Sequence, residues 1–137
     1  MVAAAVGYET QPYEVLITDD DEGCRETVRE VLTRRGYRTV LASCGREAIR
    51  IVRRQVIHVA IVDMNMPDLT GLETMTIIRR EVSVPVPGIL VSADTADDLA
   101  VQARSADFES FLPKPLDLAV LRAVVREIIN RYYEDED

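Results

Sequence analysis

The sequence has little cysteine, an excess of acidic over basic residues, and no long apolar run. Its two cysteines, Cys24 and Cys44, are too few for a disulfide scaffold, so we interpret them as reduced thiols of a cytoplasmic protein. The formal net charge of −8 argues against a binder of nucleic acid or of anionic membranes, because both would repel the chain. No stretch approaches the roughly 20 apolar residues of a membrane helix, and the N-terminus lacks the basic residues of a signal peptide.

Length and composition predict one compact domain. A chain of 137 residues of which 47% are hydrophobic can bury a sizeable core. We expect a flexible N-terminal extension over residues 1–13, a folded domain over residues 14–133, and a solvated acidic tail over residues 134–137.

Short apolar runs alternate with amphipathic segments along this domain. Most of the runs are continuously apolar, which is typical of strands covered on both faces. We predict strands over 14–18, 38–42, 58–63, 88–92 and 110–114. We predict helices over 22–35, 45–55, 69–81, 95–105 and 117–133. Strands that alternate with helices in this way predict a doubly wound α/β fold, with a parallel sheet and helices on both faces.

Several residues fit the expected ends and faces of the helices. Gly36 lies where the first helix should be capped at its C-terminus, Ser43 is expected to cap the second helix, and Asp117 can cap the last one. The residues expected to share the buried face of the last helix are Leu118, Leu121, Val125, Ile128 and Tyr132.

Polar side chains follow the ends of four of the predicted strands. Asp19 and Asp20 follow the first strand, Asp63 ends the third, Ser92 ends the fourth and Lys114 ends the fifth. Each residue alone could be a helix cap or a loop residue. Ligands of open parallel sheets bind beyond the carboxyl ends of the strands, so the five residues together predict a site at that edge.

The three acids in this set indicate a divalent cation. Two carboxylates about 4 Å apart repel by about 4 kcal/mol at an effective dielectric constant of about 20. Mg²⁺ would relieve this repulsion, and it prefers oxygen ligands and leaves positions for phosphate oxygens. A lysine and a hydroxyl nearby can hold the remaining oxygens of a phosphoryl group. We therefore interpret Asp63 as the centre of a Mg²⁺-assisted phosphoryl-transfer site.

Four motifs resemble those of a known family. The segments VLITDDDEGCRETV, AIVDMNMPDLTG, GILVSAD and FLPKP are similar, in order and spacing, to those of the receiver domain of two-component response regulators. The resemblance spans residues 14–133 and is nearest to the single-domain, chemotaxis-type regulators. It implies a flavodoxin-like strand order 2-1-3-4-5, with five helices on the two faces.

The resemblance also implies roles for the residues at the strand ends. Asp63 would be the phosphoacceptor, which becomes a 4-aspartylphosphate. Asp20 would bind Mg²⁺ directly, Asp19 would act mostly through water, and Asn65 would contribute its backbone carbonyl. Lys114 would form an ion pair with the phosphoryl group.

Other residues would report the state of the site. Ser92 would bind the phosphoryl group and move together with the aromatic residue Phe111, while Pro115 would follow Lys114 through a cis peptide bond. The side chains two positions after Asp63 and Ser92, namely Asn65 and Asp94, would tune dephosphorylation. Both are small and polar, so a short-lived phosphoryl state is expected.

The implied partners are proteins. A sensor histidine kinase or a histidine phosphotransfer protein would donate the phosphoryl group. A downstream target would bind the face formed by the segments 95–105, 110–114 and 117–133, since no output domain is expected after the last helix. The protein would not be an enzyme beyond catalysing its own phosphoryl uptake and autodephosphorylation.

Three alternative functions fit the sequence less well. A haloacid-dehalogenase-type phosphatase needs an acid two residues after the nucleophile, where this chain has Asn65, and it needs a cap domain. A nucleotide-binding domain needs a glycine-rich phosphate loop after the first strand, where this chain has TDDDEGCR. The third alternative, a receiver-fold interaction module that works without phosphorylation, is opposed by the intact acid, serine and lysine positions.

Some residues depart from the family pattern. Gly88 falls inside the fourth strand, where glycine weakens a strand. Phe108 stands where a small residue is common, and Thr18 replaces an apolar residue. Gly71 is expected to relieve the turn after the phosphoacceptor loop. The one histidine, His58, is interpreted as structural or exposed.

Overall fold

The computed structural model describes residues 12–94 and 96–134. Most of the expected N-terminal extension and acidic tail lies outside these residues. The elements in chain order are β1 (Glu14–Thr18), α2 (Glu22–Thr33), β2 (Arg38–Ala42), α3 (Gly45–Arg54), β3 (Val59–Asp63), α4 (Gly71–Glu81), β4 (Gly88–Ser92), α5 (Asp97–Ser105), β5 (Ser110–Pro113) and α6 (Leu118–Tyr133). Each corresponds to a predicted element, with ends that differ by two residues or fewer.

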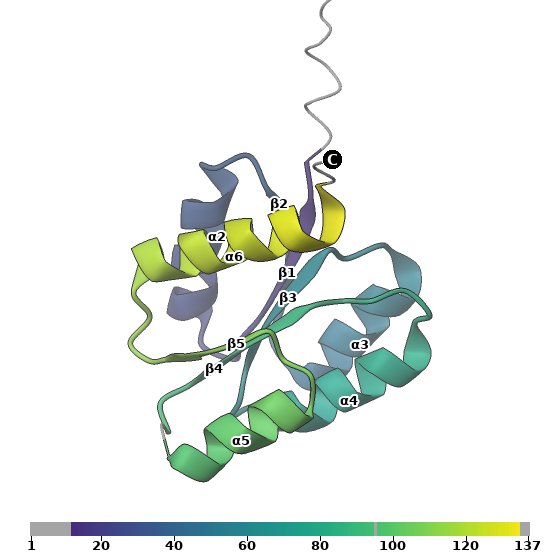
Figure 1. The fold of residues 1–137 in the computed structure, drawn as a ribbon, viewed down its shortest axis with the longest axis vertical. Helices are drawn as coiled ribbons and strands as arrows, with labels where there is room; N and C mark the ends of the chain where they lie inside the picture. The colour runs from purple at the N-terminus through teal and green to yellow at the C-terminus, as the bar shows by residue number, and fades with distance from the viewer. Residues whose placement is uncertain (1–11, 95, 135–137) are drawn as a thin grey trace, which may run out of the picture.

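The five strands form one parallel sheet in the order β2-β1-β3-β4-β5, which confirms the implied topology. After β2 the chain crosses back over β1 to add β3 on its other side. The order therefore reverses between β1 and β3, and this is the switch point where open sheets of this kind bind ligands. Helices α2 and α6 cover one face of the sheet, and α3, α4 and α5 cover the other (Figure 1).

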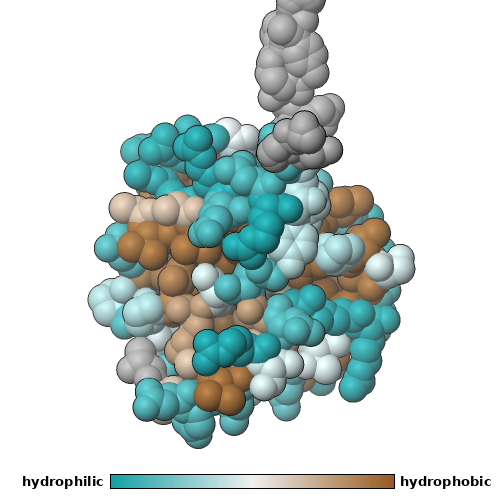
Figure 2. All heavy atoms as spheres, in the orientation of Figure 1, coloured by the Kyte–Doolittle hydropathy of each residue, from teal (hydrophilic) through white to brown (hydrophobic). Residues whose placement is uncertain are grey.

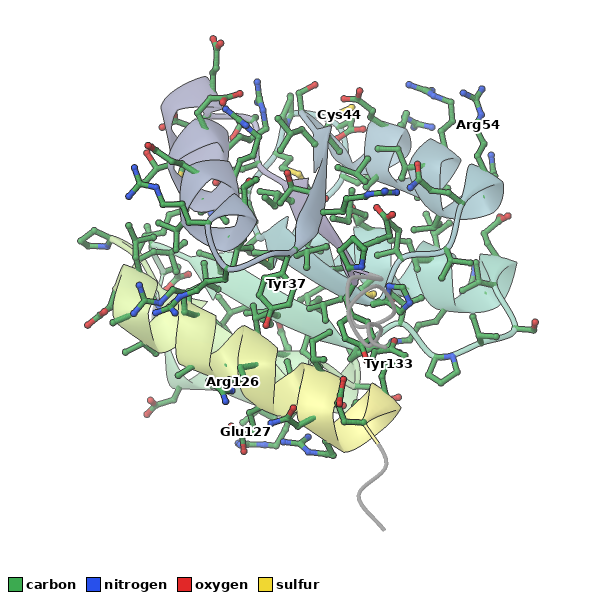
Figure 3. The ribbon with its side chains drawn as sticks, turned by 90° about the horizontal axis from the view of Figure 1, so that it is seen from above. Tyr37, Cys44, Arg54, Arg126, Glu127 and Tyr133 are labelled. Carbon is green, nitrogen blue, oxygen red and sulfur yellow. The ribbon has the colours of Figure 1, made fainter. Side chains whose placement is uncertain are left out.

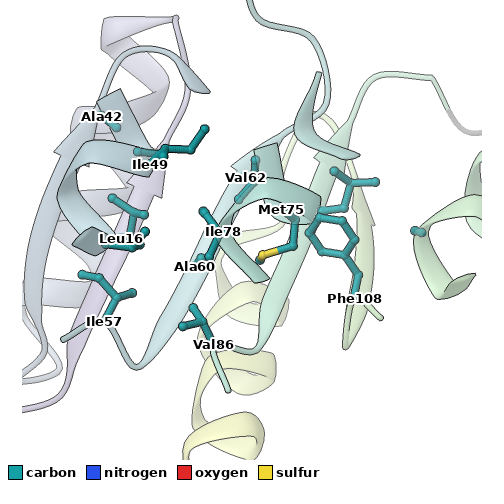
Figure 4. Close-up of a cluster of buried hydrophobic side chains, with 14 of the residues drawn as sticks. Leu16, Ala42, Ile49, Ile57, Ala60, Val62, Met75, Ile78, Val86 and Phe108 are labelled. Carbon is teal, nitrogen blue, oxygen red and sulfur yellow. The ribbon is translucent and has the colours of Figure 1, made fainter. Parts of the chain in front are cut away.

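Two apolar layers hold the helices against the sheet. One layer, between the sheet and helices α3, α4 and α5, includes Leu16, Ala60, Val62, Met75 and Ile78 (Figure 4). The other layer lies on the opposite face, under α2 and α6. All five residues of β3 and of β4 are buried. Burial on both faces explains why these strands have continuous apolar runs instead of an alternating pattern.

Gly88 and Phe108 lie close together in the first layer and pack as a pair. A Cβ atom on Gly88 would lie 2.2 Å from Cε of Met75 and 3.0 Å from Cδ1 of Phe108. Figure 4 shows the Met75 and Phe108 side chains next to each other, and the Phe108 side chain is buried. The large residue before β5 thus occupies the space that the glycine in β4 leaves open.

Two helix ends differ from the sequence predictions. Ser43 does not cap α3: the N-cap residue is Cys44, which makes no side-chain capping bond, and the Ser43 hydroxyl instead donates to Glu47 at 3.0 Å. Asp117 caps α6 as predicted, accepting from the backbone N–H of Ala119 and Val120. Thr70 forms a capping box with Glu73, so α4 begins at Gly71 and not at residue 69.

The last turn of α6 corrects another prediction. Tyr132 does not face the core: its side chain is 38% exposed, and its hydroxyl donates to Glu109. Tyr133 is the residue that faces inward, and its hydroxyl donates to the carbonyl of His58 at 2.7 Å. The rings of Tyr13 and His58 lie on the Tyr133 side of the helix, which decides which of the two tyrosines is covered.

An open groove of about 850 Å³ lies between α6 and the turn after α2. Its lining includes Tyr13, Arg35, Tyr37, Arg122 and Arg126. Figure 3 shows the Tyr37 side chain pointing toward α6, where Arg126 lies. Tyr13 precedes the first residue of β1, so the groove reaches the amino end of the sheet.

Across residues 12–94 and 96–134, the structure contains no helix with the length and apolarity needed to cross a membrane.

Candidate functional site

Three carboxylates converge at the carboxyl edge of the sheet. Asp19, Asp20 and Asp63 each present a carboxylate oxygen within 4.8 Å of the other two. The register of the sheet produces this arrangement, because Thr18 pairs with Val62 across the neighbouring strands β1 and β3. The residues that follow Thr18 and Val62 are Asp19 and Asp63, so these two acids lie side by side at the switch point. Asp19 and Asp63 are buried, whereas Asp20 is exposed.

Lys114 joins two of these acids. Its Nζ atom lies 3.0 Å from Oδ2 of Asp19 and 3.2 Å from Oδ1 of Asp63. The backbone N–H of Lys114 donates to the carbonyl of Ser92 at 2.9 Å, which continues the β4–β5 pairing by one residue. The Lys114–Pro115 peptide bond is cis, as the resemblance implies. The ammonium group therefore lies between the acids of β1 and β3.

The charges of the site shift the pKa values of its groups. Burial is the main cause that raises the pKa of Asp63 to about 6, and the charge of Asp19 raises it further, while Lys114 opposes both. Burial alone would lower the pKa of Lys114, but its hydrogen bond and charge interaction with Asp19 outweigh burial and raise that pKa. The lysine therefore stays charged, and the Asp63 carboxylate is held in surroundings that lack sufficient positive charge.

Hydrogen bonds from the N-cap residue and the first turn of α2 fix the position of Asp19. Its Oδ1 atom accepts from the backbone N–H of Asp21 at 2.9 Å. Its backbone carbonyl accepts from the guanidinium of Arg25 at 2.7 Å. Sequence reasoning missed Arg25, because its position in the first helix resembles that of any exposed charge. The nearby thiol of Cys24 has its pKa raised to about 11, mainly by burial and then by Asp19.

The structure places the other predicted site residues around this centre. Ser92 is fully buried at the end of β4, and its hydroxyl accepts from the backbone N–H of Asp94 at 3.0 Å. Asn65 and Asp94 are both exposed. Phe111 is half-buried in β5 and packs against the layer under α3, α4 and α5.

The loop after Asp63 contains a residue that sequence reasoning also missed. The carboxylate of Asp68 accepts from the backbone N–H groups of Gly45 and Arg46, at 3.0 and 2.8 Å. It therefore caps α3, a helix 23 residues earlier in the chain. In the sequence Asp68 follows Pro67, a pattern that indicates only a turn. No spacing in the sequence links that residue to the start of α3.

The donor set fits Mg²⁺. Three oxygen ligands from carboxylates, one of them exposed, suit a hard cation that keeps part of its water shell. The raised pKa of Asp63 points the same way, since the site lacks the positive charge that three neighbouring carboxylates require. Asp19, Asp20 and Asp63 are the residues that would hold the ion.

The comparisons with known proteins agree with this geometry. The family model of the response regulator receiver domain matches residues 15–126 of the sequence. The chain belongs to this family. The receiver domain is the input module of two-component response regulators, and receivers typically bind Mg²⁺ at such an acidic pocket.

Individual relatives extend the comparison. The receiver is 30% identical over 123 residues to response regulator RR06 of Streptococcus pneumoniae, covering 90% of this chain and 56% of that protein. It is 35% identical over 116 residues to the transcriptional regulatory protein KdpE of Mycobacterium tuberculosis, covering 82% and 50%. The structure of the chemotaxis protein CheY4 of Vibrio cholerae superposes with a TM-score of 0.81 at 25% identity, covering 85% and 98%.

The receiver spans about half the length of these two curated relatives. The match therefore concerns the receiver part of those proteins. The chemotaxis protein, in contrast, is covered almost completely.

Proposed function

We propose that this receiver takes a phosphoryl group from a histidine kinase or a histidine phosphotransfer protein onto Asp63. The observation that carries the proposal is the arrangement around that carboxylate, with two further acids within 4.8 Å and the Lys114 ammonium 3.2 Å away. This arrangement has an acceptor oxygen, a place for a cation and a fixed positive charge.

The reaction forms one bond and breaks one. A carboxylate oxygen of Asp63 attacks phosphorus, the P–O bond forms, and the P–N bond of phosphohistidine breaks, with its electron pair returning to the imidazole. Lys114 neutralises charge on the transferred group, and Ser92 donates its hydroxyl to a phosphoryl oxygen. Mg²⁺, when bound by Asp19, Asp20 and Asp63, would supply further charge neutralisation. The protein contributes positioning and electrostatics, so we propose that it is not an enzyme for other substrates.

The switch would pass from Ser92 to the face formed by α5, β5 and α6. Lys114 directly follows β5, and its backbone N–H donates to the carbonyl of Ser92. This hydrogen bond links the site to the edge strand β5. Figure 2 shows hydrophobic surface in a band between α5 and α6. Val101 and Val120 are exposed on these two helices. A protein target that covers apolar side chains fits this face.

Mass spectrometry of the intact protein tests the proposal. Incubation with Mg²⁺ and acetyl phosphate should add one phosphoryl group to the wild-type protein. The gain should be absent in Asp63→Asn and suppressed by a chelator of divalent cations. After acetyl phosphate is removed with Mg²⁺ retained, the decay of the added mass gives the lifetime of the phosphoryl group, which we expect to be short because Asn65 and Asp94 are small and exposed.

A matched control separates loss of the acceptor from loss of the fold. Asp107→Asn removes an exposed acid outside the site and should leave phosphoryl uptake unchanged. A folded wild-type protein that gains no phosphoryl group from acetyl phosphate or from a phosphorylated kinase would contradict the proposal. That result would favour an interaction module that works without phosphorylation.

A further inference from the structure

Two backbone hydrogen bonds hold the loop from Met64 to Thr70 near its ends, and Met66 and Leu69 between them pack against the core. The backbone N–H of Met64 donates to the carbonyl of Val91 at 2.8 Å, and that of Gly71 donates to the carbonyl of Met64 at 2.9 Å. A Cβ atom on Gly71 would lie 2.7 Å from the carbonyl oxygen of Asp63. The return of the loop therefore packs directly on the backbone of the acceptor residue.

Asp68 fastens the middle of this loop to a different element. Besides the N–H groups of Gly45 and Arg46, its carboxylate accepts from the N–H of Leu69 at 2.7 Å. The helix that it caps has no capping side chain of its own, since Cys44 makes no such bond. One carboxylate thus satisfies two free N–H groups of α3 and holds the loop in place.

The start of α3 is closely packed where Asp68 attaches. A Cβ atom on Gly45 would lie 2.4 Å from Oγ1 of Thr74 and 3.0 Å from Cβ of Leu69, so the start of α3 lies directly against α4 and the loop. Partial burial raises the pKa of Asp68, but the bonds from the backbone N–H groups outweigh it and lower that pKa to about 2. The carboxylate is therefore ionised and fully engaged at neutral pH.

We propose that Asp68 is a positioning residue for the acidic site. By fixing the loop that begins at Asp63 to the start of α3, it holds Asp63 and the neighbouring backbone where a divalent cation can bind. The part that concerns phosphoryl uptake rests on the function proposed above. The part that concerns Mg²⁺ affinity depends only on the cluster of three acids. Because linkage is reciprocal, Mg²⁺ binding should also stabilise the hydrogen bonds that Gly45 and Arg46 donate.

The test compares two helix-capping aspartates. Asp68→Ala removes the cap of α3 and the loop attachment together, whereas Asp117→Ala removes only the cap of α6, which also satisfies two N–H groups. Each variant should unfold at a lower urea concentration than the wild type, by a similar shift, because each loses a helix cap. Only Asp68→Ala should bind Mg²⁺ more weakly, by about tenfold, as when a residue that supports metal ligands is removed. Affinity is read from a Mg²⁺ titration followed by backbone amide chemical shifts.

Amide hydrogen exchange gives a second readout that a purely structural cap would not move. Saturating Mg²⁺ should slow exchange at Gly45 and Arg46 in the wild-type protein and in Asp117→Ala. Asp68→Asn retains an acceptor oxygen and should show an intermediate Mg²⁺ affinity, so it can replace Asp68→Ala if that variant does not fold. Equal Mg²⁺ affinity in the wild type, Asp68→Asn and Asp68→Ala, or no effect of Mg²⁺ on exchange at Gly45 and Arg46, would overturn the inference.

The two proposals fail in different ways. A wild-type protein that binds Mg²⁺ but takes up no phosphoryl group contradicts the proposed function, while the affinities of the Asp68 variants still decide the positioning role. Normal phosphoryl uptake by the wild type, with Asp68→Ala as active and as tight for Mg²⁺ as Asp117→Ala, contradicts only the positioning role.

Discussion

At the scale of single residues, the carboxyl edge of the sheet contains two kinds of buried polar group. Asp63 and Asp19 are buried, and the half-buried ammonium group of Lys114 pairs with both. Thr18 is also buried, 1% exposed, and its hydroxyl has no hydrogen-bond partner among the residues that the structure describes. A buried hydroxyl without a partner costs free energy, because folding removes its hydrogen bonds to water.

Thr18→Val should therefore stabilise the protein. Valine has nearly the shape of threonine, so packing is retained while the unpartnered hydroxyl is removed. We expect the free energy of unfolding to rise by about 1 kcal/mol, measured by urea denaturation. As a control, Thr39→Val alters a half-buried threonine of β2 and should change stability less. A loss of stability in Thr18→Val would show that the hydroxyl has a partner in solution.

Some residues of the site could be predicted from the sequence, and others could not. Asp19, Asp20, Asp63, Ser92 and Lys114 directly follow or end strands, and parallel strands bring their carboxyl ends to one edge, so the local pattern is sufficient. Asp68 contacts α3 through a loop whose path depends on the close packing at Gly45 and Gly71. Such packing is visible only in three dimensions.

At the scale of elements, β4 and the segment before β5 depend on each other. Gly88 is a weak strand former, yet the structure needs it, because the Phe108 ring and the Met75 side chain occupy the space of a Cβ atom. From the sequence, the two residues were separate departures from the family pattern. In the structure the Phe108 ring lies against Gly88, so the two departures belong to one packing arrangement.

Gly88→Ala should destabilise the protein by about 1–3 kcal/mol, since the added methyl group overpacks the core. The double variant Gly88→Ala with Phe108→Leu should lose less stability than the sum of the two single variants, because the smaller side chain makes room. Thermal or urea denaturation of the four proteins gives the coupling energy. Additive effects would contradict the packing argument.

Helix faces were predicted well in the middle of helices and less well at their ends. Leu121, Val125 and Ile128 are buried as their spacing predicts. In the final turn of α6, contacts with Tyr13 and His58 decide which side chain is covered, so Tyr133 faces inward and Tyr132 is exposed. Ser43 fails as a cap because a residue from another part of the chain takes that role.

At the scale of the whole molecule, three aromatic rings join the two ends of the described fold. The His58 ring lies 5.1 Å from that of Tyr13 and 5.0 Å from that of Tyr133, both edge to face. The Nδ1 atom of His58 accepts from the backbone N–H of Glu14 at 2.9 Å, which requires this nitrogen to be unprotonated. Burial lowers the pKa of His58, and the charge of Glu14 offsets this only in part.

This environment predicts a pH-dependent stability. Because the folded state binds the His58 proton more weakly than the unfolded chain, the contribution is complete above about pH 6.5 and is lost as the pH falls below that value. Urea denaturation at about pH 7.5 and about pH 5.5 should show a smaller loss for His58→Asn than for the wild type. Asparagine retains an acceptor for the Glu14 N–H but does not titrate in this range. An equal pH dependence of both proteins would contradict this prediction.

The contact between the two ends has a practical consequence for engineering. The hydroxyl of Tyr13 donates to Glu134, and the Tyr13 and Tyr133 rings are 5.7 Å apart, at the edge of the sheet opposite the acids. A short linker could therefore join these positions, and new termini could be opened in a surface turn to give a circular permutant. A fluorescent reporter attached at either position would lie at the edge of the sheet opposite Asp63.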